Sequence, residues 1–310
     1  MLGVYREVVE GDMRIPVIPG EKTASERFPG AEETHSIEAM MQDGRALQAG
    51  TSHFLGQNFA RAANIQFQDR DSALRFVFTT SWGASTRLIG AMIMTHSDDD
   101  GLRLPPRMAP HHVVFIPILR DPSLTERVIN ACRSLAGQLS EQRFAGEPVR
   151  AYVDLTEDTP GQRRWSWIKK GVPLICEIGP RDLEGDQVTV TRRTAVHERK
   201  ETVAMDTLVA GVSERLKALD ERLYDDACAY REARTRRDIE RFEDFEAFFA
   251  GEDGGGFVHA KWSGDPSTEG RLGALGVTIR CLPHTQSGTT GRCVLSGAPA
   301  TLDAVFAKAY

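Results

Sequence analysis

Hydrophobic and polar positions in the first hundred residues predict a hairpin, a strand and a helix. Apolar runs at 35–41 and through Leu47-Gln48 flank Gln42-Asp43-Gly44, and Asp-Gly between two such runs is a strong hairpin signal. The apolar residues of 88–94 recur at helical spacing. The other predicted elements are the end of a helix at 2–10, an extended piece at 15–18, a helix from about 54, a strand at 73–78 and a helix end at 97–101.

The middle of the chain alternates strand-like and helix-like segments. A proline-rich crossing segment at 101–110 marks the first expected domain boundary. Beyond it, residues 125–142 have one apolar stripe and predict a helix, and Thr159-Pro160 has the N-cap and N1 residues of another. This alternation predicts a small α/β domain with a mostly parallel or mixed sheet. Its strands are expected at 111–118, 149–155, 172–178 and 187–192.

The last third predicts a long helix followed by a small unit. Residues 207–241 are rich in Arg and Glu, which predicts a solvated face. The residues after the helix, 254–310, predict an α+β unit with a strand, a helix and three further strands. The apolar stripe of the long helix consists of Leu208, Val212, Leu216, Leu219 and Leu223.

Composition narrows the class of protein. The chain has 310 residues, 41% hydrophobic and 26% charged, which predicts a globular protein of two or three domains. No apolar run approaches the roughly 20 residues of a membrane span. Five scattered cysteines and no signal-peptide pattern predict a reducing cytoplasm. Because the net charge is −6, any RNA contact must come from a local basic patch.

One stretch, 79–101, holds the first candidate site. Ser81-Trp82-Gly83 precedes a turn that ends in Arg87, whose guanidinium can stack on an aromatic ring and hold a phosphate. The stretch resembles motif 3 of class II aminoacyl-tRNA synthetases, in the form of the archaeal/eukaryotic type of prolyl-tRNA synthetase. The resemblance implies that Ser85 and Arg87 bind ATP, that Arg87 is catalytic, and that Trp82 and Gly83 shape a proline pocket. By itself, the corner also fits an ordinary core helix with a solvated arginine.

A second stretch, 36–60, is similar to the active-site floor of the same synthetases. It reads SIEAMMQDGRALQAGTSHFLGQNFA. The resemblance implies that Gln48 and Thr51 bind ATP, with Gln48 catalytic and beside the magnesium of Mg-ATP. It also implies that His53 lines the proline pocket and that Glu38 lies close to the metal. Activating a carboxylate with ATP needs in-line geometry and charge neutralisation more than a base, which such groups can supply. The alternatives are a partly buried histidine for His53 and a helix N-cap for Thr51.

A third stretch, 161–193, reads GQRRWSWIKKGVPLICEIGPRDLEGDQVTVTRR and resembles the anticodon-binding domain of these synthetases. The resemblance implies that Lys170, Glu177 and Arg181 contact the anticodon. Cations interleaved with aromatic rings suit unstacked bases, because rings stack on bases and cations hold phosphates. A charged helix face over a hydrophobic sheet is the alternative. The interleaved residues are Arg163, Arg164, Trp165, Trp167, Lys169 and Lys170.

The C-terminal unit departs from the family in one respect. The final FAKAY is typical of this synthetase type, whose terminal carboxylate folds back toward the catalytic domain. Some members hold zinc with cysteines in this unit, but Ser263 and Ser296 stand at two of those positions. The unit retains only Cys281 and Cys293, and two thiolates do not complete a tetrahedral site. We therefore expect no zinc.

Together these patterns predict an α/β and α+β multidomain protein. Residues 1–108 are expected to be the C-terminal part of a class II antiparallel-sheet catalytic domain, 109–205 an α/β anticodon-binding domain, and 206–310 a connecting helix with a small α+β domain. Motifs 1 and 2 are not found, so we expect an incomplete sheet with an exposed edge. We further expect this chain alone to bind ATP poorly and to form no prolyl-adenylate.

The implied function is that of a proline–tRNA ligase using ATP and Mg²⁺. Its partners would be proline, ATP and tRNA(Pro), with no membrane, and the full-length enzyme would be a homodimer in the cytoplasm. The alternative is a non-catalytic fragment or paralogue that binds tRNA through its anticodon-binding domain.

Overall fold

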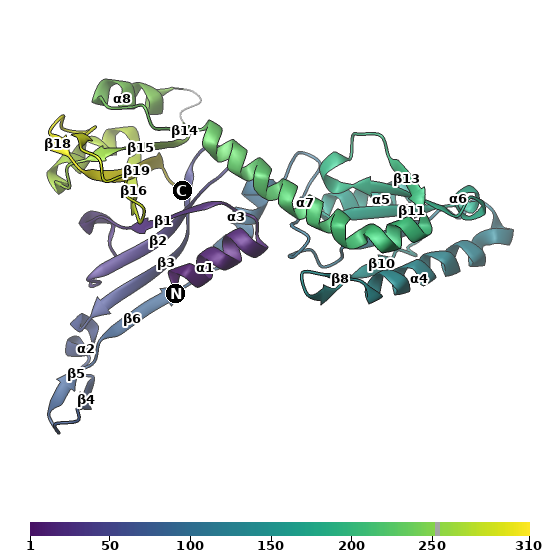
Figure 1. Cartoon of the computed structure of the whole chain (residues 1–310), viewed down its shortest axis with the longest axis horizontal. Helices are drawn as coiled ribbons and strands as arrows, with labels where there is room; N and C mark the ends of the chain where they lie inside the picture. The colour runs from purple at the N-terminus through teal and green to yellow at the C-terminus, as the bar shows by residue number, and fades with distance from the viewer. Residues whose placement is uncertain (252–254) are drawn as a thin grey trace. The chain divides into compact units, whose positions relative to one another are not determined.

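The computed structural model describes residues 1–251 and 255–310. They form two compact units, which Figure 1 shows with their elements labelled. Gly254, the first residue of the predicted third unit, lies outside the described residues. The first unit contains residues 1–11, 15–95 and 227–310, and the second contains residues 12–14 and 96–226.

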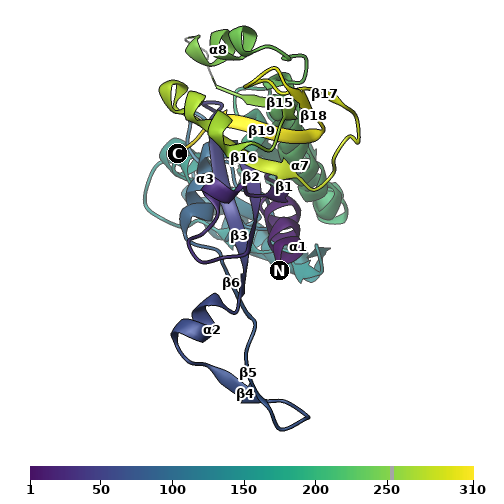
Figure 2. The ribbon, with the colours of Figure 1, turned by 90° about the vertical axis from the view of Figure 1, so that its left-hand side faces the viewer.

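The first unit is built on an eight-stranded sheet. Neighbouring strands are antiparallel except β14 and β15, which are parallel. The C-terminal strands continue the sheet of the N-terminal ones, because β16 pairs with β1 (Figure 2). In spatial order the strands are β14 (Thr235–Arg236), β15 (Phe257–Trp262), β19 (Leu302–Lys308), β16 (Val277–Pro283), β1 (Val17–Glu21), β2 (Glu33–Met40), β3 (Ala46–Gly56) and β6 (Thr79–Gly83).

This sheet joins strands of the predicted first domain, 1–108, to strands of the predicted third domain, 206–310. Strand pairing shows which segments are in contact but not where one domain ends and the next begins. The division into 1–108, 109–205 and 206–310 therefore stays a prediction. Strand β6 is the last in the sheet, and no strand pairs with its outer edge in the part of the chain that the structure describes. Phe78 and Trp82 are 68% and 52% exposed there. The expected exposed edge is thus observed among these residues.

The C-terminal strands pack a core on both faces of the sheet. Successive residues of β19 alternate, so Phe306 faces one apolar cluster and Val305 the other. Phe306 meets Phe245 of α8 edge-on, with ring centroids 5.2 Å apart. Burying one such side chain stabilises a fold by about 1.5–3 kcal/mol. The fully buried rings therefore fix this end of the sheet.

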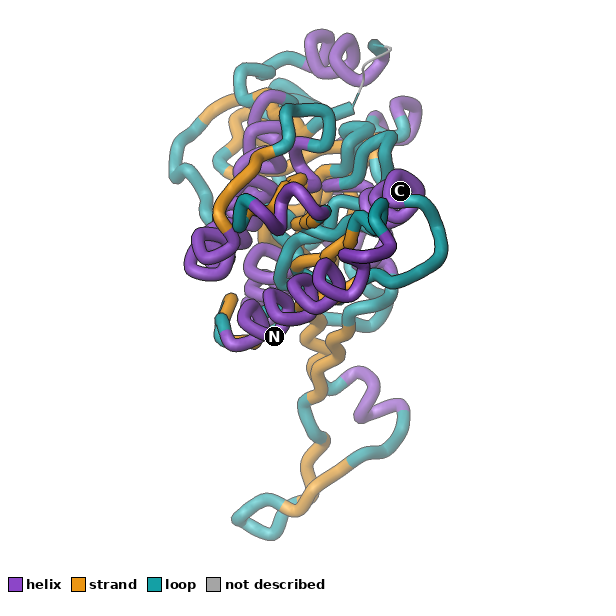
Figure 3. Tube along the Cα trace, turned by 90° about the vertical axis from the view of Figure 1, so that its right-hand side faces the viewer, coloured by secondary structure: helices purple, strands orange, loops and turns teal. Residues whose placement is uncertain are grey.

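The other elements of the first unit are short, and the β4–β5 ribbon extends beyond the sheet (Figures 2 and 3). The helices are α1 (Leu2–Arg6), the π-helical η1 (Glu7–Asp12), α2 (Asn58–Ala62), α3 (Arg87–His96) and α8 (Phe242–Ala250). The 3₁₀ turns are η2 (Ala24–Glu26), η5 (Pro266–Arg271) and η6 (Gly273–Leu275). The ribbons are β4 (Gln66–Gln68) with β5 (Leu74–Phe76), and β17 (Gly291–Arg292) with β18 (Pro299–Ala300).

The second unit is a five-stranded mixed sheet with helices on both faces. Strands β10, β7 and β11 are parallel, and β12 and β13 are antiparallel. In spatial order the strands are β10 (Ala151–Val153), β7 (Val113–Pro117), β11 (Leu174–Ile178), β12 (Gln187–Arg192) and β13 (Glu201–Ala204). The helices and ribbon are η3 (Pro122–Leu124), α4 (Thr125–Glu141), β8 (Arg143–Phe144) with β9 (Glu147–Pro148), α5 (Pro160–Lys169), α6 (Pro180–Glu184), η4 (Arg193–Ala195) and the part of α7 (Met205–Ala233) up to residue 226.

Alternation along the strands explains how both faces are covered. Val113 and Phe115 point to a cluster formed with α4 and α7, whereas Val114 and Ile116 point to α5. The α/β fold predicted for this part of the chain is confirmed. So is the long helix, whose five stripe residues are all buried. It ends at Ala233, earlier than predicted, because residues 235–236 join the sheet as β14.

Two local predictions have different outcomes. The hairpin turn at Asp43-Gly44 is confirmed: Gly44 adopts a φ of +77° between β2 and β3. The helix predicted from about 54 exists but begins later, as α2 at Asn58, because β3 runs to Gly56 and pairs with strands on both sides. The ladder hydrogen bonds outweigh local propensity there. In the C-terminal unit, the 3₁₀ turns η5 and η6 lie where an α-helix was predicted.

Candidate functional site

The predicted ATP and proline residues are brought to β3 and its neighbours. Thr51 pairs with Gly83 of β6, and His53 pairs with Ser81. Directly opposed residues of an antiparallel pair share a face of the sheet. Thr51, His53, Ser81 and Gly83 therefore face the same way. Because Thr51 lies inside β3, its alternative role as a helix N-cap is wrong.

A β-bulge adds Gln48 to this face. The β2–β3 register shifts so that Ile37 opposes Gly50 and Glu38 opposes Gln48, which leaves Ala49 as the extra residue. Without the bulge, side chains three residues apart on a strand would point to opposite faces. With it, Gln48 and Thr51 point to the same side. The three side chains expected to form the active-site floor thus share one face.

Trp82 does not share this face. It pairs with Ser52, which alternates with Thr51 and His53, so its indole points to the opposite side of the sheet and is 52% exposed. Trp82 and His53 therefore cannot line one pocket as predicted. The serine–tryptophan–glycine run could not reveal this, because only strand register decides which face each residue takes.

Arg87 opens α3, just past the end of β6, so the predicted strand-to-helix corner is confirmed. Residues 79–87 are mostly exposed, including Ser85 and Arg87. The Ser85 hydroxyl accepts a hydrogen bond from the Arg87 backbone N–H at 3.3 Å. The guanidinium has no ion pair or hydrogen bond among residues 1–251 and 255–310. It is therefore a free cation beside the floor.

His53 is surrounded by two residues that the sequence did not single out. Its Nδ1 lies 3.0 Å from the Thr34 hydroxyl, and its ring centroid lies 5.0 Å from that of Phe28. Burial lowers the pKa of His53, so the imidazole is neutral at neutral pH. The partly buried histidine that we weighed as an alternative describes this environment well. The combination also offers a ring, a neutral imidazole and a hydroxyl to a small ligand.

Glu38 differs from its expected role beside the metal. It is fully buried, and Lys22 and Arg280 each make an ion pair with it, at 2.8 and 2.9 Å. The Ser36 hydroxyl also donates to it at 2.8 Å. A buried carboxylate needs such compensation. Because both oxygens are engaged, Glu38 holds β1, β2 and β16 together and leaves no oxygen for a metal.

The three residues predicted to contact an anticodon do not lie together. Glu177 is near the end of β11, where it pairs with Lys200, and Arg181 follows it in α6. Lys170 is the C-cap of α5, in the turn before the first residue of β11, Leu174, whereas Glu177 is the last residue but one of that strand. Lys170 and Glu177 therefore lie toward opposite ends of β11.

The predicted cluster of cations and aromatic rings is partly structural. Arg163 is 5% exposed and donates to the carbonyls of Asp154 and Pro117, at 2.7 and 2.9 Å. It is therefore not a candidate for RNA contact, because α5 turns it into the core of the second unit. The Trp167 indole donates to the Asp154 carboxylate at 2.8 Å. Helix α5 begins at Pro160 with Thr159 as its N-cap, as predicted.

The C-terminal residue lies beside the floor strand. The Tyr310 backbone N–H donates to the Ala46 carbonyl at 3.2 Å, and its hydroxyl donates to Asp43. The Arg45 guanidinium lies 5.8 Å from the centre of the Tyr310 ring. Tyr310 therefore packs on the β2–β3 hairpin, and the turn of its carboxylate toward a catalytic domain stays a prediction.

The cysteines of the C-terminal part are buried separately. Cys281 and Cys293 belong to different apolar clusters. Within the described residues, no three His, Cys, Asp or Glu side chains are grouped so as to hold a metal ion. Burial alone would raise the pKa of Cys293, but hydrogen bonds with Ser296 and Ser263 lower it below its ordinary value. The expectation of no zinc stays a prediction.

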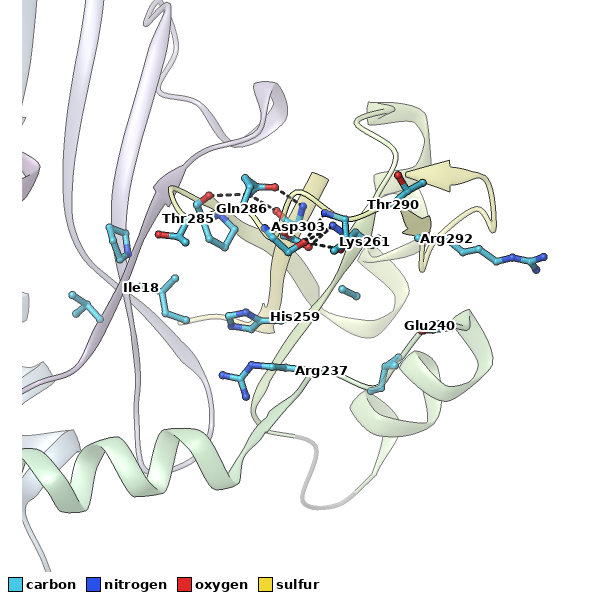
Figure 4. A pocket seen from close by; sticks show the side chains of 18 residues that line it. Ile18, Arg237, Glu240, His259, Lys261, Thr285, Gln286, Thr290, Arg292 and Asp303 are labelled. Atoms are coloured by element: carbon cyan, nitrogen blue, oxygen red, sulfur yellow. Dashed lines mark hydrogen bonds and ion pairs between the residues drawn. The ribbon is translucent and has the colours of Figure 1, made fainter. Parts of the chain in front are cut away.

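The first unit also contains a hollow of about 820 Å³, which no predicted site residue lines. Lys261 and Asp303 form an ion pair of 2.7 Å in its wall, and His259 lies below them (Figure 4). Lys261 also donates to Ser287 and to the Thr301 carbonyl, so its charge is fully compensated. Nothing in this wall selects one ligand chemistry. None of the helices within the described ranges is long and apolar enough to cross a bilayer.

Two family comparisons match separate parts of the chain. Residues 112–215 match the family described as "Anticodon binding domain", and residues 243–310 match "Prolyl-tRNA synthetase, C-terminal". The first match covers most of the second unit. The second covers α8 and the C-terminal strands of the eight-stranded sheet.

Similar proteins extend the likeness to all 310 residues. The chain is 48% identical to a protein named proline–tRNA ligase from Protochlamydia amoebophila, 47% to proline–tRNA ligase 2 from Anaeromyxobacter dehalogenans and 46% to a proline–tRNA ligase from Paramagnetospirillum magneticum. Each likeness covers 100% of this chain and 62% of the relative. The chain is thus similar, over its whole length, to somewhat less than two thirds of a proline–tRNA ligase, including an anticodon-binding domain and the C-terminal domain of the prolyl-tRNA synthetases.

Proposed function

We propose that this chain is part of a proline–tRNA ligase, which activates proline with ATP and transfers it to tRNA(Pro). One observation carries the proposal: the likeness to proteins of that name extends over the whole chain at 48% identity. The shared face of Gln48, Thr51 and His53 supports it, because a bulge is needed to bring the three together. Bulges are frequent next to active sites, where they re-aim a side chain.

In this proposal the β3 face binds the two small substrates. The Gln48 amide and the Thr51 hydroxyl hold ATP, with the Ser85 hydroxyl and the Arg87 guanidinium above them. Arg87 neutralises charge on the phosphates as the proline carboxylate attacks, which is electrostatic catalysis without an enzyme nucleophile. The neutral His53 and the exposed ring of Phe28 receive the proline ring, and Gly83 leaves room beside them.

On this face magnesium would be held mainly by the phosphates of ATP and by few protein ligands. Bound Mg²⁺ usually keeps several waters and is held by substrate phosphates with few protein ligands. Glu38 is committed to Lys22 and Arg280, which leaves the amide oxygen of Gln48 as the donor on this face. When bound with ATP, the ion would offset phosphate charge. Gln48 would orient it.

The remaining assignments belong to the same proposal. tRNA(Pro) binds the second unit, with Glu177 and Arg181 at one end of its sheet. The enzyme acts in the cytoplasm as a homodimer of the archaeal/eukaryotic type. The FAKAY ending supports that type. No structural zinc is required, because serines replace cysteines at positions 263 and 296.

Calorimetric titration with a non-hydrolysable prolyl-adenylate analogue tests the proposed site. The analogue should bind this chain, and Gln48→Ala and Arg87→Ala should each weaken it about tenfold or more, as for the loss of a charge-assisted contact. Arg292→Ala is the matched control, because Arg292 is an unpaired arginine of the same unit within the described ranges. Equal losses in the control and the site variants would contradict the assignment.

The second candidate is a tRNA-binding module without catalysis. The exposure of Arg87 and of the β6 edge favours it, because a nucleotide site normally excludes water. It predicts saturable binding of a tRNA(Pro) transcript with no detectable analogue binding. Proline-dependent ATP–pyrophosphate exchange by the chain would exclude it.

A further inference from the structure

A recess of about 350 Å³ lies beside the amino-terminal ends of β7 and β11 in the second unit. Leu102 and Leu104 of the crossing segment form one wall, and Trp167 forms another. His111 and Lys170 complete it. The recess is thus apolar inside, with a cation at its edge. Its volume is at the small end of the range for ligand pockets.

Two glycines bring the walls of the recess together. Gly101 and Gly171 have φ of +128° and +77°. A Cβ on Gly101 would lie 2.6 Å from the Lys169 Cα, and one on Gly171 would lie 2.8 Å from the Leu102 Cβ. The Leu102 N–H also donates to the Lys169 carbonyl at 3.0 Å. The crossing segment is therefore tied against the turn that carries Lys170.

Three aromatic rings meet at the recess. His111 stacks on Tyr152 with centroids 5.0 Å apart, and it meets Trp167 edge-on at 5.7 Å. Tyr152 and Trp167 are also in contact, at 5.6 Å. The bond from the Trp167 indole to Asp154 fixes the plane of its ring. These rings form a rigid surface before any ligand arrives.

The charges that act on His111 are both positive. Lys170 Nζ lies 4.2 Å from the centre of the Trp167 ring. Burial, then Arg150 and Lys170, lowers the pKa of His111, and no carboxylate is among the groups that act on it. His111 is therefore a neutral ring under the influence of two cations. Asp154, the acid nearest Trp167, is already held by the indole and by Thr156.

We propose that this recess binds one unpaired nucleobase of tRNA, stacked against His111 and Trp167, with an adjoining phosphate on Lys170. The inference rests on the proposed function, and it adds a second RNA contact at the end of the sheet opposite Glu177 and Arg181. Aromatic rings beside a cation suit single-stranded RNA, because every base has a face that stacks and every nucleotide has a phosphate. An acidic group would be needed for a cationic ligand, and among the described residues no carboxylate is one of the groups that act on His111.

The proposal also explains the place of Lys170. If Lys170 contacted the anticodon together with Glu177, both would be expected at the same end of β11. Lys170 instead precedes the strand, and Glu177 is near its other end. Taken with the rings, Lys170 completes a nucleotide-sized site. Sequence pointed to Trp167 and Lys170 but not to their partners, because His111 and Tyr152 reach them only through the parallel pairing of β7 and β10.

The test uses two substitutions of one residue. Trp167→Phe and Trp167→Leu both lose the bond to Asp154, but only Phe keeps a ring. A fluorescein-labelled tRNA(Pro) transcript should bind Trp167→Leu roughly 5- to 100-fold more weakly than Trp167→Phe, the range expected for one stacked base. Thermal melts of both variants check that they fold alike. Tyr152→Ala, at a half-exposed edge strand, should weaken binding in the same direction.

A charge-matched pair tests the phosphate contact. Lys170→Ala should lower the slope of log Kd against log salt by about 0.7, the value for one phosphate of a single strand. Lys169→Ala removes the same charge from the neighbouring exposed residue, outside the recess, and should change the slope less.

Two results would overturn the inference and are distinguishable. If the wild-type chain binds the transcript but Trp167→Phe equals Trp167→Leu and Lys170→Ala equals Lys169→Ala, the recess takes no base and the proposed function stands. If the wild-type chain does not bind the transcript, the proposed function fails and the inference fails with it.

Discussion

Replacing Glu38 by glutamine tests how the N-terminal and C-terminal strands are held in one sheet. Glu38 accepts hydrogen bonds from Lys22 at 2.8 Å, from Ser36 at 2.8 Å and from two nitrogens of Arg280 at 3.0 and 2.9 Å. Lys22 and Arg280 are 2% and 6% exposed. Glu38→Gln keeps the shape of the side chain but leaves two cations buried without their counter-charge. Breaking a buried ion pair in this way costs about 3–5 kcal/mol.

Cysteine labelling measures this loss at the right place. Cys281 neighbours Arg280 on β16 and is fully buried, so a thiol reagent reaches it only when the sheet opens. A loss of about 3–5 kcal/mol should speed its labelling roughly 150- to 5,000-fold. Cys176, fully buried in the second unit, is the internal control and should keep its rate.

A triple variant separates pairing from packing. Lys22→Met, Glu38→Leu and Arg280→Met together remove every charge of the cluster, and apolar replacement of a buried ion cluster is often neutral or stabilising. Labelling of Cys281 should therefore return toward the wild-type rate. The reasoning is refuted if Glu38→Gln changes the rate less than about fivefold, or if the triple variant labels as fast as Glu38→Gln.

Further predictions concern the turn at Gly171 and the partly buried His259. Gly171→Ala should destabilise the second unit by more than about 1 kcal/mol in thermal melts, because the φ of Gly171 is positive and Leu102 fills the space a Cβ would take. The control is Gly161→Ala, in an open position on α5, which should stabilise the unit by roughly 0.5–1 kcal/mol. Equal effects would contradict the geometry. Burial, with help from nearby arginines, lowers the pKa of His259 to about 4. The unfolded chain takes up this proton near pH 6.5 and the folded chain does not, so His259 should cost up to about 3 kcal/mol of stability as the pH falls from 6.5 to 4. His259→Asn should lose less stability over that interval, and parallel pH profiles for the two proteins would exclude this role.

Local patterns predicted elements whose signals lie within a few residues. The apolar stripe of 208–223 predicted α7, and Asp43-Gly44 predicted the β2–β3 hairpin. Both follow from periodicity or turn chemistry alone. The alternation of strands and helices also predicted the α/β fold of the second unit. In the first two cases the determining signal lies within a few residues of the chain.

Predictions failed where distant pairing decides the structure. β3 extends to Gly56 because β2 and β6 flank it, so the helix predicted from about 54 begins only at Asn58. The bulge at Ala49, which aligns Gln48 with Thr51, depends on register and leaves no mark in a single sequence. Arg163 had the same local pattern as an RNA-binding arginine, but packing turned it inward. Residue types therefore suggested the site, and tertiary register decided which of them share a face.

Hydrogen exchange with a saturating prolyl-adenylate analogue shows whether the β3 face is the substrate site. The analogue should slow exchange at 46–56 and 79–87, the floor strand and the Arg87 corner. The hollow lined by His259 and Lys261 is an internal comparison in the same unit, and its peptides should not change. Protection confined to that hollow, or none in the floor strand and corner, would contradict a substrate site on the β3 face.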